Sequence, residues 1–155
     1  MYLTVTRKRV TTVILTVLLA GLVAGIFLKV GASGIDGSTA EARLAYIRSL
    51  GCDASECREK EVTLPQKADE VYAEYEKLQS KAGFKLAPYY GSRVTVYTYT
   101  SVSYPLCSGE TQLNLIVCRG RIIGGDISET ALNGKMLPLV SAEGNKTQDE
   151  KTAIG

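Results

Sequence analysis

The sequence predicts an α+β fold, with an N-terminal transmembrane helix followed by a small two-layer domain of two helices packed on an antiparallel sheet of about four strands. Three observations predict it. Residues 10–28 form an uncharged apolar run, two segments with helical spacing of apolar residues follow, and several β-rich segments separated by turn residues come last. Helices followed by a run of strands are typical of an α+β domain. A chain of 155 residues has room for one such domain.

The uncharged run at residues 10–28 has the length of a membrane span. As a helix it would extend about 28 Å, close to the ~30 Å apolar core of a bilayer. Arg7, Lys8 and Arg9 precede it, and positive charge stays on the cytoplasmic side of a membrane. We therefore expect a single-pass protein of the cell membrane, with residues 1–9 in the cytoplasm, the bilayer as partner of the span, and the domain outside.

Two further features of this segment bear on its role. Small residues at 30–32 would suit a signal peptidase, so a cleaved signal peptide is the alternative, although its apolar region is typically shorter, about 7–15 residues. Gly21 and Gly25 form a GxxxG pattern, which can bring two helices into contact and would support a homodimer.

The remaining chain divides into a linker over residues 29–37, a domain over 38–139 and a tail over 140–155 that we expect to be disordered. The first helix is predicted at 39–50, opened by a capping box from Ser38 to Glu41. The second is predicted from Pro65 to Ala82, with an apolar stripe on one face. That stripe comprises Ala68, Val71, Tyr72, Tyr75, Leu78 and Ala82.

Alternating and β-branched residues predict the strands. A charged edge strand is expected at 58–64, followed by strands at 93–104, 112–118 and 121–128, and a short one within 134–139. Arg119-Gly120 predicts a tight hairpin turn. Gly124-Gly125, inside a strand, predicts a bulge or the close approach of another element. The sheet is expected to bury one face against the second helix.

Several segments occur in the same order in a known bacterial family; they are ARLAYIRSLG, EVTLP, DEVYAEYEKLQSKAGFKLAPYYG, VYTYTSVSYP and RIIGGDIS. Over residues 40–137 the chain resembles the exported family called domain of unknown function forty-eight-thirty. It departs from that pattern at Cys52 and Lys135, where the family has aromatic residues. The resemblance implies an extracytoplasmic location and the fold class, and it implies no activity.

Composition excludes several function classes. The chain has no histidine, which removes the usual general base and the commonest metal ligand, and we expect no enzyme activity, metal or cofactor. Residues 38–137 hold twelve Lys/Arg and twelve Asp/Glu, whereas a nucleic-acid binder needs a basic surplus. We therefore expect no nucleic-acid partner.

Five residues are candidates for a site. Asp126 follows the double glycine and could be aimed at a ligand, or could cap a turn beneath a helix. Tyr97 and Tyr99 share one strand face and would form an aromatic ledge for a ligand if that face is open, or core if it is covered. Cys52 and Cys57 could close a disulfide across a loop, or could stay reduced as small apolar residues.

These observations favour a non-catalytic binding or sensing module at the cell envelope, whose partner is an envelope protein or a glycan. One alternative is a hydrolase of an envelope polymer. Another is an inhibitor or assembly factor that pairs through an exposed strand edge.

Overall fold

The computed structural model describes residues 34–100 and 102–144, which belong to one compact unit. The predicted span at 10–28, Arg7, Lys8 and Arg9 before it, the Gly21 and Gly25 pattern and residues 145–155 lie outside the described residues. Within the part that is described, no helix is both long enough and apolar enough to cross a membrane.

One antiparallel sheet organises the domain. Its strands run in the order β1-β5-β4-β3-β2, and β6 pairs with the same side of β5 as β1 does. Their bounds are Ile35–Asp36 (β1), Cys57–Thr63 (β2), Arg93–Tyr99 (β3), Thr111–Cys118 (β4), Arg121–Glu129 (β5) and Met136–Pro138 (β6). The four longest strands match the predicted ones, whereas β1 was not predicted because two residues carry no readable alternation.

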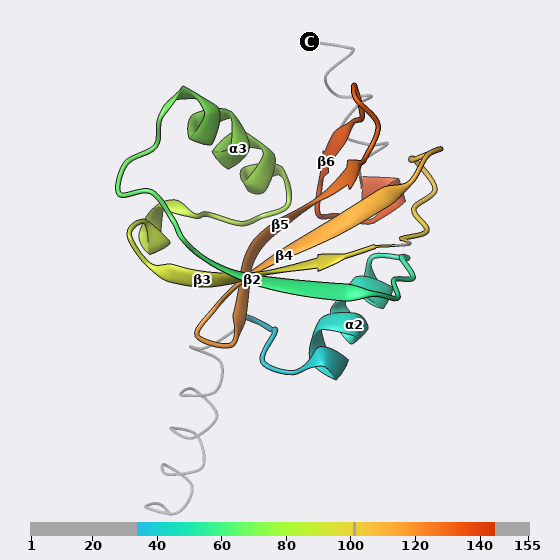
Figure 1. Cartoon of the computed structure of the whole chain (residues 1–155), viewed down its shortest axis with the longest axis horizontal. Helices are drawn as coiled ribbons and strands as arrows, with labels where there is room; N and C mark the ends of the chain where they lie inside the picture. Colours follow the sequence, from blue (N-terminus) through green and yellow to red (C-terminus); the bar gives the residue numbers. More distant parts are fainter. Residues whose placement is uncertain (1–33, 101, 145–155) are drawn as a thin grey trace, which may run out of the picture. The chain divides into compact units, whose positions relative to one another are not determined.

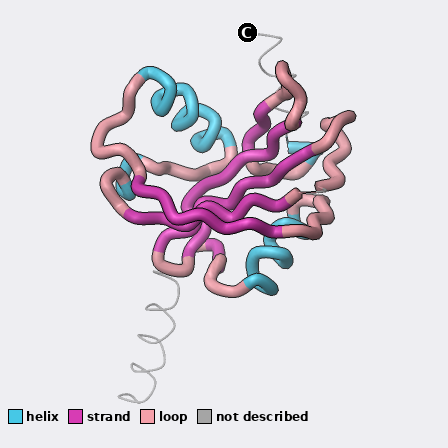
Figure 2. The backbone as a smooth tube through the Cα atoms, viewed as in Figure 1, coloured by secondary structure: helices cyan, strands magenta, loops and turns pink. Residues whose placement is uncertain are grey.

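The helices cover both faces of this sheet, so the predicted two-layer arrangement is wrong. Helix α2 (Ala40–Ser49) lies on one face, and α3 (Glu70–Lys81) with the 3₁₀ turn η1 (Ala87–Tyr89) lies on the other (Figure 1). The tube in Figure 2 shows the twisted strands passing between them. Strand β4 explains why both faces need cover. Its Leu113 and Leu115 belong to the core under α2, and its Ile116 belongs to the core under α3 and η1.

Helix starts differ from prediction because other side chains cap them. Helix α3 begins at Glu70, five residues after Pro65, since the Asp69 carboxylate accepts a hydrogen bond from the Tyr72 amide at 2.8 Å. Thr39 rather than Ser38 caps α2, accepting from the Ala42 amide at 3.1 Å.

The double glycine serves both predicted purposes. The β4–β5 register shifts by one residue after Ile122, which places a bulge immediately before Gly124. A Cβ at Gly124 would lie 2.7 Å from the Gln79 side-chain oxygen, so the missing side chain lets α3 approach. Gln79 is fully buried and was absent from the predicted stripe, whereas Val71 from that stripe is 76% exposed.

Gln79 fills a gap in the sheet edge. Strand β1 pairs with β5 at Ile122, β6 pairs from Asp126 onward, and the residues between have no strand partner on that side. The Gln79 amide donates to the Gly125 carbonyl at 2.9 Å and accepts from the Gly125 N–H at 2.9 Å. A side chain of α3 therefore replaces a missing strand.

The chain after β3 leaves the sheet earlier than predicted, at Tyr99. Tyr104 packs back into the core, and its hydroxyl donates to the Val140 carbonyl at 3.2 Å. Residues 142–144 form a helical turn, and Ala142 packs against the same core. The packing of the domain thus includes residues past the expected boundary at Leu139.

Candidate functional site

Asp126 lies in the middle of β5 and is only 4% exposed. Its carboxylate accepts hydrogen bonds from the Tyr75 hydroxyl at 2.8 Å, the Asn114 amide at 3.0 Å and the Ser128 hydroxyl at 3.2 Å. Burial, and then the nearby charge of Asp126, raises the pKa of the Tyr75 hydroxyl above its usual range. Asp126 therefore joins α3 to the sheet and has little surface to offer a ligand.

A polar row continues from Asp126 across the sheet. In the strand register, Asp126 lies opposite Asn114, Asn114 lies opposite Thr98, and Thr98 lies opposite Arg58. The Thr98 hydroxyl donates to the Asn114 side-chain oxygen at 2.8 Å. All four side chains point to the α3 face, because residues paired directly across strands share a face.

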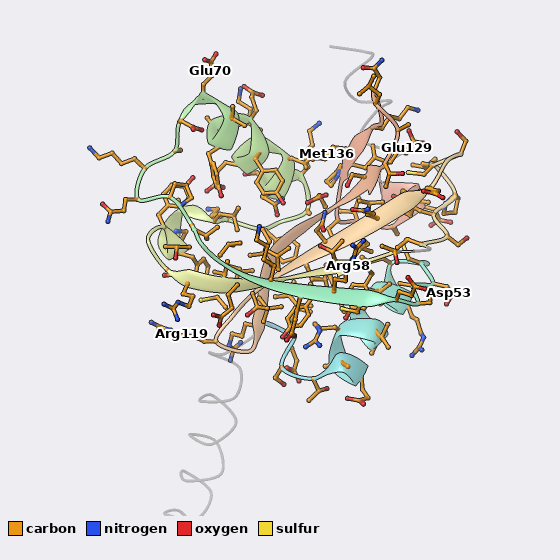
Figure 3. All side chains as sticks on the ribbon, viewed as in Figure 1. Asp53, Arg58, Glu70, Arg119, Glu129 and Met136 are labelled. Carbon is orange, nitrogen blue, oxygen red and sulfur yellow. The ribbon has the colours of Figure 1, made fainter. Side chains whose placement is uncertain are left out.

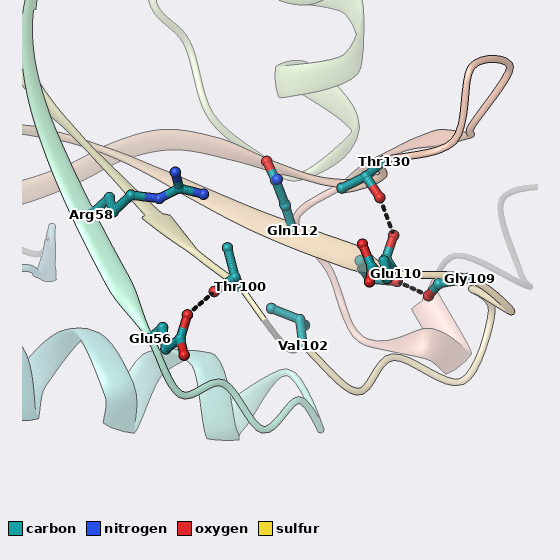
Figure 4. Close-up of a pocket in the computed structure, with 9 residues that line it drawn as sticks. Glu56, Arg58, Thr100, Val102, Gly109, Glu110, Gln112 and Thr130 are labelled. Carbon is teal, nitrogen blue, oxygen red and sulfur yellow. Dashed lines mark hydrogen bonds between the residues drawn. The ribbon is translucent and has the colours of Figure 1, made fainter.

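Beyond this row, no described helix covers that face of the sheet (Figure 1), and the face is hollowed. The hollow has a volume of about 360 Å³ and lies where β2, β3, β4 and β5 diverge (Figure 4). We call this surface the polar sheet face; it is lined by Glu56, Arg58, Thr100, Val102, Gly109, Glu110, Thr111, Gln112 and Thr130.

The polar sheet face mixes hydrogen-bond donors with acceptors. Arg58 and Glu56 stand on the β2 side, Glu110 on the opposite side, and Gln112 between them (Figure 4). The Thr100 hydroxyl donates to the Glu56 carboxylate at 3.3 Å, a long bond between groups that reach solvent. Such a surface can bond a ligand that is rich in hydroxyl or amide groups, because amides and hydroxyls pair with donors and acceptors alike.

Tyr97 and Tyr99 do not form an open ledge. Tyr99 is 2% exposed and belongs to the core beneath α2. The Arg43 guanidinium from α2 lies 3.6 Å from the centre of the Tyr97 ring and donates to the Tyr99 hydroxyl at 3.1 Å. Both tyrosines therefore hold α2 on the sheet through a cation–π contact and a hydrogen bond.

All four cysteines are free in this structure, so of the two alternatives for Cys52 and Cys57 it has the unpaired thiols. Cys52 is buried in the core, whereas Cys57 is exposed at the start of β2. Burial, together with the charge of Asp53 and the neighbouring Cys107 thiol, raises the pKa of Cys52 to about 11. Cys52 behaves as a small apolar core residue.

A second hollow, of about 440 Å³, lies at α3 and is mostly apolar; it is lined by Val71, Tyr72, Glu74, Tyr75, Leu78 and Met136. Met136 is 53% exposed. The predicted apolar stripe of the second helix therefore borders an open hollow over part of its length. Among the described residues, no group of three or more acidic or cysteine side chains is placed to hold a metal ion.

Sequence reasoning missed the polar sheet face, although a signal for it was present. Polar residues alternate with apolar ones in three strands that pair with one another, at 98 and 100, at 112 and 114, and at 126, 128 and 130. Alternation marks a half-covered sheet. Read across strands rather than along each strand, it would have indicated one polar face.

No family model, curated protein or solved structure matches this chain. The resemblance to domain of unknown function forty-eight-thirty stays a prediction.

Proposed function

We propose that this protein is a membrane-anchored, non-catalytic module outside the cytoplasm, and that it binds a glycan of the cell envelope on the polar sheet face. The observation that carries the proposal is the hollow itself, which the described residues leave open and which Glu56 and Arg58 of the β2 segment line together with Gln112 of β4. Helix α3 and η1 pack on the apolar part of this sheet face, and the hollow lies in its polar part.

The chemistry of the hollow supports a glycan. Sugar hydroxyls donate to carboxylates and accept from guanidinium and amide N–H groups, and the hollow presents all three. Glu56 directly precedes β2 and Glu110 directly precedes β4, so both carboxylates lie beside strands of the sheet. The anchor and its orientation are the predictions made from residues 7–28.

Two alternatives have their own support. Glu56 and Glu110 border one hollow, and paired carboxylates are what a glycan hydrolase uses. Among the described strands, β2 pairs with β3 alone and has no partner on its other edge, which favours an inhibitor or assembly factor that adds a partner strand. Its alternating charges, Arg58 to Glu61, work against such pairing.

Co-sedimentation of the full-length protein in detergent with purified, peptide-free cell-wall glycan tests the proposal. Arg58→Ala should weaken binding about tenfold or more, the scale of one lost charge-assisted hydrogen bond. Lys60→Ala is the matched control, since Lys60 lies on the same strand but does not line the hollow.

Equal binding by both variants and the unmodified protein would refute the proposed surface. Release of soluble sugar fragments that stops with Glu110→Gln would favour the hydrolase. Binding of an envelope protein that persists in Arg58→Ala, with no glycan binding by any variant, would favour the strand edge.

A further inference from the structure

The tip of the β4–β5 hairpin carries an arginine in a costly conformation. Arg119 has a φ of +50° and is followed by Gly120 at +74°; among the described residues it is the one non-glycine with positive φ. Such two-residue turns favour Asn-Gly, because most side chains crowd the backbone there. Arg119 is exposed, so its long cationic side chain is held out at the tip against local preference (Figure 3).

Two further arginines stand beside this tip. Arg121 begins β5, and Gly34 makes room for it, because a Cβ at Gly34 would lie 2.6 Å from the Arg121 Nη1 atom. Arg93 begins β3, and its carbonyl oxygen lies 3.9 Å from the Cys118 sulfur at the end of β4. We call Arg93, Arg119 and Arg121 the arginine edge.

Two carboxylates belong to the same end of the sheet. Glu61 lies 3.9 Å from Arg93, with both side chains largely exposed, and Asp36 interacts with Arg121. Exposed pairs of this kind attract only weakly. Three cations against two carboxylates leave the edge positive.

The arginine edge is also where the domain joins the N-terminal segment. The Gly37 N–H donates to the Gly120 carbonyl at 2.9 Å, and β1 pairs with the first residues of β5. Gly34 follows Leu28, the last residue of the predicted span, by six residues. Six residues reach at most about 20 Å when fully extended, so the anchor proposed above would hold Gly34 within about that distance of the bilayer.

We infer that the arginine edge rests on the headgroups of anionic phospholipids. A guanidinium suits this partner, because its planar donors match phosphate oxygens and its charge is permanent. An anionic bilayer attracts each nearby basic side chain within a Debye length. The inference depends on the membrane anchor of the proposed function and adds a contact that orients the domain above the membrane.

Hydrogen exchange of the full-length protein in vesicles tests this contact. The peptide covering residues 118–122 would be followed in vesicles of phosphatidylcholine alone and of phosphatidylcholine with phosphatidylglycerol. Hydrogen exchange of this peptide should be about fivefold slower in the anionic vesicles, because one arginine near a charged membrane surface contributes about 1 kcal/mol. Adding 1 M salt should abolish the difference.

Arg119→Asn separates charge from fold, because asparagine suits the turn better than arginine does. For Arg119→Asn, the ratio of exchange rates between the two kinds of vesicle should fall toward one. Lys135→Gln, in the loop between β5 and β6, should keep the full ratio. Equal exchange in both vesicles by a protein that floats with them would overturn the inference and leave the anchor intact. Failure to float would overturn the anchor, and with it this inference.

Discussion

Replacing Gln79 with methionine removes the side-chain amide from the gap in the sheet while keeping nearly the same volume. The Gly125 N–H and C=O would then lose the partners that lie at 2.9 Å. Each buried backbone group left without a partner costs about 1–3 kcal/mol, so the loss of two partners should lower the free energy of unfolding by about 2–6 kcal/mol. A domain in the upper part of the ordinary stability range of about 5–15 kcal/mol would stay folded but weakened.

Urea unfolding of a fragment covering residues 34–155, followed by circular dichroism, measures this loss. Every strand pairing of the sheet lies inside that fragment, so we expect it to fold alone. The urea concentration at the unfolding midpoint should fall, while the dependence of the unfolding free energy on urea should stay unchanged. That combination indicates lost stability rather than a changed unfolded state. Gln66→Met, the same exchange at an exposed site, should change stability by less than about 0.5 kcal/mol. An equally small effect of Gln79→Met would refute the view that this amide replaces a strand.

Three other predictions concern the core and the thiols. Leu86 is fully buried, so Leu86→Ala should lower the free energy of unfolding by about 2–5 kcal/mol. Leu78→Ala, at a half-exposed site bordering the apolar hollow, should lower it clearly less in the same urea assay. Equal losses would show that the hollow is closed. At pH 8, alkylation followed by mass spectrometry should modify exposed Cys57 well before buried Cys52. Because folding raises the pKa of Cys52 from 9.0 to about 11, the folded state holds this proton more tightly, and stability should fall as pH rises from about 9 to about 11. Cys52→Ala should reduce this loss of stability between about pH 9 and about pH 11. An unchanged pH profile in that variant would show that the loss does not come from the Cys52 thiol.

Local signals in the sequence were sufficient for most elements. The hairpin turn at Arg119 and Gly120 occurs as predicted, since two adjacent strands need such a turn and glycine permits positive φ. The double glycine correctly indicated both a bulge and a close approach. In each case the determining interactions lie within a few residues of one another, which is why a single stretch of sequence carries them.

Contacts between distant residues required the tertiary structure. The sequence left open whether Tyr97 and Tyr99 form a ledge or a core. The position of α2, held by Arg43, decided for the core. Gln79 looks like a surface residue of an amphipathic helix, yet it is fully buried because a gap in a strand more than forty residues away accepts its amide.

The sequence by itself therefore determined the α+β class, the positions of the main strands and the absence of histidine chemistry. The tertiary structure decided that helices cover both sheet faces and that polar residues from several strands meet in one hollow. The physical reason is that alternation fixes which residues of one strand share a face, whereas what covers that face depends on packing between segments far apart in the chain.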